Sequence, residues 1–164
     1  MTLKYSTELK YPRPADVVIK MFTDRAYFEK KYQSMDVTDF KVDTVVTGDP
    51  FTIRCRYSAA GDINVPDFAK KLIGEAIRVT QTDVWQVAKR TGTIDIEILG
   101  APVSVHADMK LVSSGAGSVL KLDWQFRCSI PLLGGKIEKL IAEDVERRTA
   151  MDARVSIKLL EAYA

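Results

Sequence analysis

The chain has 164 residues, of which 46% are hydrophobic and 28% are charged, and its formal net charge is +2. A chain of this length buries about 70% of its unfolded surface on folding, and the composition differs from that of disordered and membrane proteins. Its basic residues form isolated pairs such as Lys30-Lys31 and Arg147-Arg148, whereas nucleic-acid binding needs a longer basic stripe. We therefore expect one domain over residues 1–164 and no nucleic-acid partner.

The apolar runs of the sequence are short. None approaches the roughly 20 residues that a membrane-spanning helix needs, and the first predicted strand begins almost at Met1. We expect no integral membrane segment, no signal peptide and a cytoplasmic location. The only cysteines, Cys55 and Cys128, lie in apolar strand patterns, which argues against a disulfide scaffold and favours two small core residues.

The first elements are a strand and two short helices. Residues 2–11 alternate between apolar and polar side chains, which predicts a half-buried strand. Two prolines, Pro12 and Pro14, interrupt this strand because proline lacks an amide donor and restricts the residue before it. One helix is predicted from about Pro14 to Phe22, and a second is predicted after Asp24, its expected N-cap.

From about residue 36 to residue 130 the chain predicts strands separated by turns. The first two form a hairpin across Gly48-Asp49-Pro50, and Phe40, Val42 and Val46 are expected to share one face. A short helix is predicted over residues 67–73, behind Pro66. Four further strands bring the expected total to seven, at about residues 75–88, 94–98, 103–111 and 120–126.

Residues 134–163 predict one helix of about eight turns, because the segment has no proline and no glycine after Gly135. Its apolar residues recur at helical spacing and are expected to cover a hydrophobic face. They are Ile137, Ile141, Val145, Val155 and Leu159.

The order of strand, two short helices, six strands and one long helix resembles the helix-grip fold of the START-like superfamily. That superfamily includes birch pollen allergens, lipid-transfer START domains and polyketide cyclases. The segments Val65-Pro66-Asp67-Phe68 and 129–138 look like a bacterial branch of unknown function within it. The resemblance implies an α+β fold in which a seven-stranded curved antiparallel sheet wraps around the C-terminal helix and leaves an apolar cavity. It implies no particular activity, because one fold serves many functions.

The sequence contains few residues typical of catalytic or metal sites. Strand alternation places the single histidine, His106, on the outer face, together with Arg54 and Arg56. With one histidine and no clustered cysteines we expect no metal site, and we expect no cofactor. Gly134-Gly135-Lys136 is followed by isoleucine where a phosphate loop has serine or threonine. A hydrolase is not supported either, since no Gly-x-Ser-x-Gly elbow is present.

Large side chains predicted to face inward either fill the core or line a ligand pocket, and the sequence does not separate the two sets. They are Tyr5, Phe40, Tyr57, Trp85, Ile96, Met109, Trp124 and Phe126. As ligand-binding candidates we select Tyr57, Trp85, Ile96, Met109 and Trp124.

Three charged residues of the long helix complete the candidate site. Asp144, Arg148 and Asp152 follow one another at four-residue spacing and share the arc of the apolar face. Because buried charge is costly unless it is paired, one interpretation is a ladder in which Arg148 bridges both carboxylates. In the other interpretation, Arg148 offers part of its guanidinium to a ligand carboxylate or enolate.

The leading functional hypothesis is binding or transport of a hydrophobic small molecule, lipid-like or polyketide-like, by a carrier or sensor. The second is an enzyme of the polyketide cyclase/aromatase type, in which Arg148, Asp152 or Tyr57 assists the reaction. The third is a chaperone-regulator-like module that binds proteins and has a collapsed cavity. The sequence gives no oligomeric state.

Overall fold

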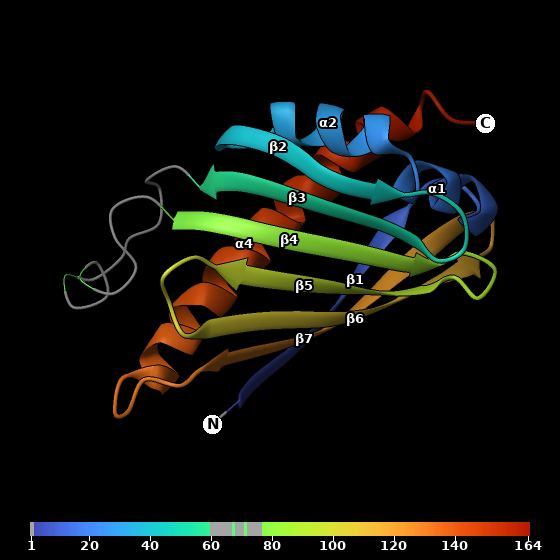
Figure 1. The fold of residues 1–164 in the computed structure, drawn as a ribbon. Helices are drawn as coiled ribbons and strands as arrows, with labels where there is room; N and C mark the ends of the chain where they lie inside the picture. Colours follow the sequence, from blue (N-terminus) through green and yellow to red (C-terminus); the bar gives the residue numbers. More distant parts are fainter. Residues whose placement is uncertain (1, 60–66, 68–70, 72–76) are drawn as a thin grey trace.

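The computed structural model describes residues 2–59, 67, 71 and 77–164. Figure 1 shows the elements of these residues in chain order: β1 (Thr2–Tyr11), α1 (Ala15–Phe22), α2 (Arg25–Gln33), β2 (Val37–Val46), β3 (Phe51–Ala59), β4 (Ile77–Gln86), β5 (Thr91–Ile98), β6 (Val103–Ser114), β7 (Gly117–Cys128) and α4 (Gly134–Leu160). The predicted order of elements is confirmed. The short helix predicted over residues 67–73 lies mostly outside the described residues.

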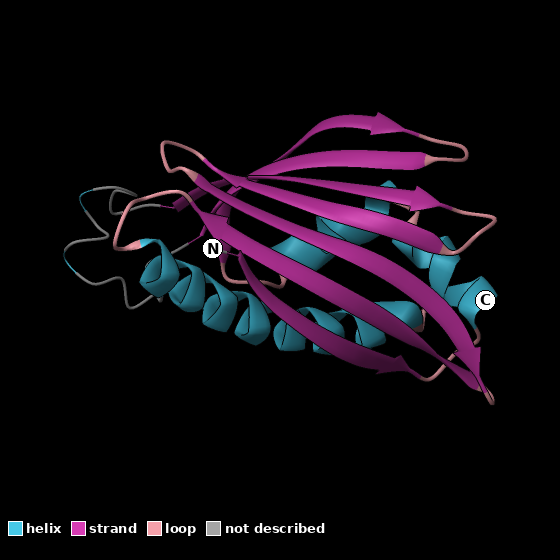
Figure 2. Cartoon of the chain, turned by 90° about the horizontal axis from the view of Figure 1, so that it is seen from below, coloured by secondary structure: helices cyan, strands magenta, loops and turns pink. Residues whose placement is uncertain are grey.

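The strands form one antiparallel sheet in the order β1-β7-β6-β5-β4-β3-β2. Each strand from β2 to β6 pairs with the next strand in the chain, and β1 pairs with β7, where Tyr5 lies opposite Trp124. The sheet curves, and α4 crosses its concave face (Figure 2). A hydrophobic sheet face and a hydrophobic helix stripe need each other's cover, which explains why the two form the main layers of the fold.

The inner face of the sheet forms most of the core. Along β6 and β7 every second residue is buried, from Val103 to Leu111 and from Leu120 to Cys128, as the pleat of a half-covered sheet requires. Phe126 is fully buried, whereas Tyr5 and Phe40 are half-buried and pack against the core. The prediction that both cysteines are core residues is confirmed, since Cys55 and Cys128 are buried free thiols.

Strand β2 departs from simple alternation. Its pairing with β3 shifts register twice, between Thr38 and Lys41 and between Val42 and Thr44. A bulge adds an unpaired residue and therefore moves the following side chains to the opposite face. The expectation that Val46 shares a face with Phe40 and Val42 is wrong, because Val46 is 59% exposed.

The helices begin where the sequence predicts. The Asp24 carboxylate accepts a hydrogen bond from the Ala26 N–H at 3.1 Å, which confirms it as the N-cap of α2. At the start of α4, the buried Glu138 carboxylate accepts the Cys128 N–H at 2.8 Å and so connects the helix to the end of β7. None of the described helices is long and apolar enough to span a bilayer.

The buried stripe of α4 follows the prediction only in part. Ile137 is buried, and Ile141 and Val145 pack against the core as expected. Toward the C-terminus the buried positions are Ser156 and Leu160, each one residue after the predicted Val155 and Leu159, which are half-exposed. The face shifts because α2 packs against this end of α4 and its Tyr27 contacts Ser156.

Candidate functional site

A cavity of about 160 Å³ lies between α4, α2 and the concave face of the sheet. Most of its lining is apolar and aromatic, and all eight candidate residues selected from the sequence contribute to it. They are Tyr57, Trp85, Ile96, Met109, Trp124, Asp144, Arg148 and Asp152. The sheet supplies the first five through its inward-facing positions, and α4 supplies the three charged residues.

The lack of a side chain at Gly92 leaves room for two residues of the cavity wall, Trp85 and Met109. Gly92 of β5 lies opposite Trp85 in the pairing of β4 with β5. A Cβ at this position would clash with the carbonyl oxygen of Val84 and would lie 3.1 Å from both the Trp85 ring and the Met109 methyl group. The absence of a side chain therefore allows Trp85 and Met109 to take their places against the cavity.

The predicted ladder on α4 is wrong in its second half. Arg148 Nε donates to Asp144 Oδ2 at 2.9 Å, and Arg147 Nη2 donates to the other Asp144 oxygen at 3.1 Å. No hydrogen bond or ion pair joins Arg148 to Asp152 in the described structure. Long side chains on a helix point back toward its N-terminus, so Arg148 reaches the residue four positions before it rather than the residue four positions after it. The buried Arg148 Nη2 has no hydrogen-bond partner among the described residues.

Asp152 instead pairs with Lys31, a residue that our sequence analysis missed. Lys31 Nζ lies 3.0 Å from Asp152 Oδ2, and only 4% of the lysine side chain is exposed. The rings of Tyr27, Phe28 and Tyr32 surround the ammonium at 5.0, 4.9 and 4.8 Å from their centroids, distances typical of cation–π contacts. Burial alone lowers the pKa of Lys31, but the carboxylates of Asp152 and Asp83 outweigh it and raise the pKa, so the lysine is charged.

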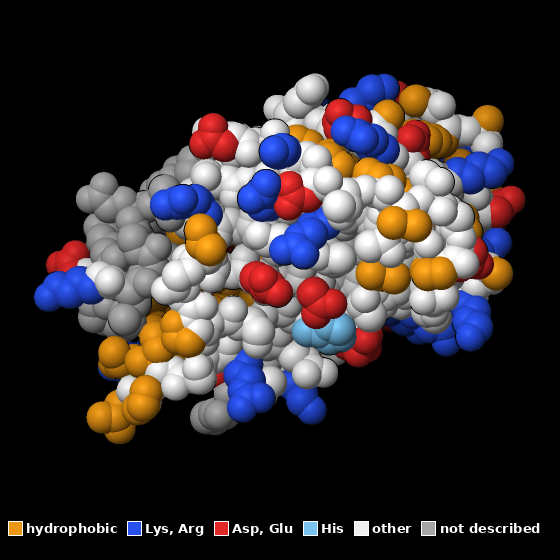
Figure 3. All heavy atoms as spheres, in the orientation of Figure 1, with side chains coloured by type: hydrophobic (Ala, Val, Ile, Leu, Met, Phe, Trp, Pro, Cys, Tyr) orange, Lys and Arg blue, Asp and Glu red, His pale blue; other side chains and the backbone are white. Residues whose placement is uncertain are grey.

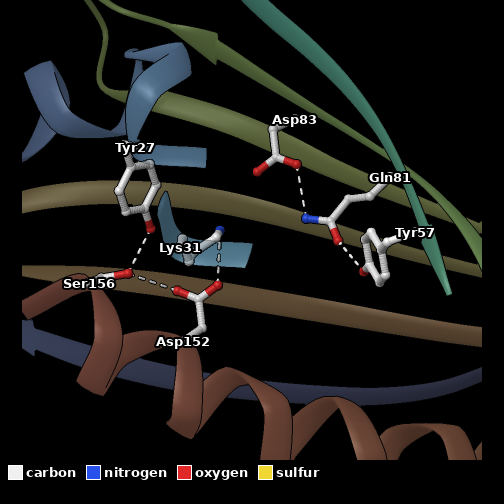
Figure 4. Close-up of polar contacts among 7 residues, drawn as sticks. All are labelled: Tyr27, Lys31, Tyr57, Gln81, Asp83, Asp152 and Ser156. Atoms are coloured by element: carbon white, nitrogen blue, oxygen red, sulfur yellow. Dashed lines mark hydrogen bonds and ion pairs between the residues drawn. The ribbon is translucent and has the colours of Figure 1, made fainter. Parts of the chain in front are cut away.

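Hydrogen bonds fix the carboxylate that Lys31 contacts. Ser156 Oγ donates to Asp152 Oδ1 at 3.0 Å, and the Tyr27 hydroxyl lies 2.7 Å from the same Ser156 oxygen. Because the serine proton is directed to Asp152, Tyr27 donates to Ser156. Tyr27, Ser156, Asp152 and Lys31 thus form one connected network between α2 and α4 (Figure 4).

A second polar network lies on the sheet. Tyr57 Oη donates to Gln81 Oε1 at 2.9 Å, and Gln81 Nε2 donates to Asp83 Oδ1 at 3.0 Å (Figure 4). Gln81 and Asp83 are both buried and line the cavity. Burial raises the pKa of Asp83 to about 6, although Lys31 and the Gln81 hydrogen bond oppose the rise.

The sequence carries signals for the missed residues. Lys31 follows Tyr27 by four positions and Phe28 by three, which places it on the aromatic face of α2. Gln81 and Asp83 precede Trp85 by four and two positions along β4, so strand alternation gives them the inward face that we predicted for Trp85.

Residues expected on the outer face do lie there. His106 contacts Asp95 through Nδ1 at 2.7 Å and Asp108 through Nε2 at 3.2 Å, and Figure 3 shows this face with the histidine among acidic side chains. The hydrogen bond to Asp95, and then the one to Asp108, raise the pKa of His106.

The two arginines expected on the outer face pair with one carboxylate. Arg56 Nη2 lies 2.8 Å from Asp43, and Arg54 lies 3.9 Å from the same carboxylate. Within the described ranges no group of three or more His, Cys, Asp or Glu side chains is placed to hold a metal ion.

Solved structures share the fold at low sequence identity, among them the following three. An aromatase/cyclase from Streptomyces sp. R1128 has a TM-score of 0.69 and 14% identity, over 98% of this chain and 94% of that chain. Ara h 8.0201 has a TM-score of 0.67 and 15% identity, over 99% of both chains. A START superfamily protein from Mycobacterium smegmatis has a TM-score of 0.56 and 12% identity, over 97% of both chains.

These likenesses confirm the helix-grip fold that the order of elements predicts, and identities this low show the fold alone. No curated protein matches the sequence. The family model described as "Protein of unknown function (DUF2505)" matches residues 6–159, nearly the whole chain. The chain therefore belongs to the DUF2505 family, and it has the helix-grip fold of START-like and birch-pollen-allergen-like proteins.

Proposed function

We propose that this protein binds a small apolar molecule, lipid-like or polyketide-like, in the cavity between α4 and the sheet. The observation that carries the proposal is an apolar cavity whose lining also holds five charged side chains. They are Lys31, Asp83, Asp144, Arg148 and Asp152. A core that only stabilised the fold would favour apolar side chains here, because buried charge is costly. Ligand sites, by contrast, are mostly apolar with a few polar groups that fix orientation.

The cavity volume sets the size of the group that fits. An engineered cavity of about 150 Å³ in another protein binds benzene, so about 160 Å³ accommodates one ring-sized apolar group. Trp85, Trp124, Met109, Ile96 and Tyr57 supply its walls. In this proposal Arg148, held by Asp144, donates from Nη2 to an oxygen of the ligand, and Asp152 holds Lys31 in place.

Intrinsic fluorescence tests this proposal, because the only two tryptophans of the chain, Trp85 and Trp124, both line the cavity. Titration with benzyl alcohol should change the emission and saturate at one ligand per chain. Native mass spectrometry of the purified chain should show co-purified small molecules. Ile96→Phe narrows the cavity and should lower the affinity for benzyl alcohol. Val46→Phe, at an exposed site, should leave this affinity unchanged. Unchanged emission together with a clean apo mass would refute ligand binding.

The second candidate is an enzyme of the cyclase/aromatase type, and the position of Asp83 favours it. A carboxylate with a pKa of about 6 is suited to proton transfer near neutral pH. Asp83 would take a proton from the carbon next to a ketone, while the electron pair moves onto the oxygen and the Arg148 guanidinium stabilises the enolate. In D₂O the wild type should then exchange the α-protons of cyclohexanone faster than Asp83→Asn, and equal rates would exclude this role.

A further inference from the structure

One carboxylate of the cavity has no ion pair. Three carboxylates, Asp83, Asp144 and Asp152, face two cations, Lys31 and Arg148. Arg148 pairs with Asp144 at 2.9 Å, and Lys31 pairs with Asp152 at 3.0 Å. Arg147, outside the lining, also pairs with Asp144 at 3.1 Å, whereas Asp83 makes no ion pair with any described residue.

Asp83 is held in place but not neutralised. Its Oδ1 accepts from Gln81 Nε2 at 3.0 Å, and Tyr57 occupies the oxygen of the same amide at 2.9 Å. The second oxygen, Oδ2, makes no hydrogen bond or ion pair with a described residue, and no dashed line joins it to the residues drawn in Figure 4. The residue is 7% exposed on the inward face of β4 and lines the cavity. Asp83 therefore presents a carboxylate oxygen, held in position and without a hydrogen-bond partner, to a ligand that enters the cavity.

The surroundings of this oxygen are typical of a recognition site. Along β4 the inward positions are Ile77, Val79, Gln81, Asp83 and Trp85. An apolar residue at position 83 would continue this row without the cost of desolvating a carboxylate. Lys31 lowers the pKa of Asp83, but its ammonium is paired with Asp152. A carboxylate kept there without an ion pair of its own points to a cation that arrives from outside.

We propose that Asp83 is the ion-pairing site for the protonated amine of an apolar ligand, so that the ligand class is a small hydrophobic, preferably aromatic, amine. This inference rests on the proposed function, because it requires the cavity to bind a small apolar molecule. An ammonium group supplies an ion pair for Asp83 and donates a charge-assisted hydrogen bond to Oδ2. A hydroxyl group donates a hydrogen bond but leaves Asp83 without an ion pair.

Three probes with one ring and different charge test the inference: benzylamine, benzyl alcohol and benzoate. Calorimetry on the full chain at pH 7.5 should give the tightest binding for benzylamine and the weakest for benzoate. Asp83→Asn keeps the shape of the side chain and the oxygen that accepts from Gln81. It should lower the affinity for benzylamine at least ten-fold and change the affinity for benzyl alcohol less than about three-fold. Asp95→Asn removes a carboxylate from the outer face of the adjacent strand and should leave the order of the three probes unchanged.

A pH series on the unmodified protein gives an independent measurement. Because Asp83 titrates near pH 6, benzylamine affinity should fall between pH 7.5 and pH 5, while that of benzyl alcohol should change much less. The titratable groups around Asp83 come from four elements. They are Tyr27, Lys31 and Tyr32 on α2, Cys55 and Tyr57 on β3, Asp95 on β5, and Asp144, Arg148 and Asp152 on α4. Asp83→Asn should abolish the pH dependence, which assigns it to Asp83 among these groups.

The outcomes separate the two proposals. If benzyl alcohol binds but benzylamine binds no more tightly, or if Asp83→Asn weakens both equally, the amine inference is wrong and the binding function stands. If none of the three probes binds the wild type, the amine inference is wrong. If the purified chain also shows a clean apo mass, the proposed function is wrong with it.

Discussion

The Lys31 ammonium of α2 lies 3.0 Å from the Asp152 carboxylate of α4, inside an aromatic cage and beside an apolar cavity. The two residues come from nearly opposite ends of the chain. Their ion pair and the Tyr27–Ser156 hydrogen bond connect the helix that follows β1 to the helix that ends the chain. The position of α2 over the cavity therefore depends on polar as well as apolar contacts.

Replacing Lys31 by methionine removes this cation and leaves Asp152 and Asp83 facing an apolar wall. We expect a loss of about 3 to 5 kcal/mol in the free energy of unfolding at pH 7.5, as for other broken buried pairs. Acid should recover part of the loss, because Lys31 holds the pKa of Asp83 down and its removal favours the protonated form. Urea unfolding at pH 7.5 and pH 5 measures both effects. The exposed neighbour provides the control: Lys30→Met should change stability little, and a similar loss for both variants would contradict the buried pair.

Asp83→Asn should stabilise the protein at neutral pH. In the folded state the pKa of Asp83 is about 6, above its usual value of 3.8, because burial disfavours the charged form. The folded state therefore binds the proton more tightly, and this penalty is present above pH 6 and disappears as pH falls toward 4. At about 1.4 kcal/mol per pKa unit, the variant should gain about 2 to 3 kcal/mol at pH 7.5 and almost nothing at pH 4. Melting temperatures of both proteins across this range provide the measurement, and a constant difference would show that Asp83 does not titrate as described.

Arg148 and Arg147 form a matched pair, because both donate to Asp144 while only Arg148 is largely buried. Arg148→Met should lower the free energy of unfolding by about 1 to 3 kcal/mol, since it leaves the largely buried Asp144 carboxylate with fewer hydrogen bonds. Arg147→Met should lower the free energy of unfolding by less than about 1 kcal/mol, as is usual for exposed ion pairs.

The same two variants test the proposed ligand contact of Arg148. Arg148→Met should weaken binding of acetophenone more than binding of ethylbenzene, because only the ketone carries an oxygen that accepts from Nη2. Arg147→Met should affect neither ligand. An equal loss for both ligands would remove Arg148 from the proposed polar contacts.

Glu138 tests how α4 is attached to the sheet. Glu138→Met leaves the buried Cys128 N–H without its acceptor and should lower the free energy of unfolding by about 1 to 3 kcal/mol. Glu138→Gln keeps an oxygen at the same position and should cost clearly less. Equal losses measured by thermal unfolding would show that the hydrogen bond contributes little.

The fold was predictable from the sequence because its signals are local. Strand alternation, the prolines after β1 and the uninterrupted C-terminal segment each report on neighbouring residues, and together they gave the order of elements. The errors arose where a contact with a distant residue, or a bulge, determines which way a side chain points. Val46 points outward because β2 contains bulges, and α4 buries Ser156 because α2 meets it there.

The candidate site was predicted through the residues of α4 and of the sheet, and all eight selected residues line the cavity. Two of its charged residues were missed. Lys31 lies in a helix of largely polar composition, and its partner Asp152 is far away in sequence, so no local spacing shows the pair. The alternation that placed Trp85 on the inner face also places Asp83 there, but it predicts only the direction of the side chain. That Asp83 has no ion pair appears only once the other ion pairs of the cavity are known.

The orientation of Gln81 determines where a proton can reside on Asp83. Because the Tyr57 hydroxyl donates to the amide oxygen, the amide nitrogen must face Asp83, and Oδ1 must act as an acceptor. A proton taken up below pH 6 therefore resides on Oδ2, the oxygen that has no other partner. Acidification then converts this oxygen from a hydrogen-bond acceptor into a donor. If Asp83 pairs with an ammonium group at pH 7.5, as proposed, the same position would favour a carbonyl group at pH 5, and the proposed site would exchange one class of ligand for another through this proton alone.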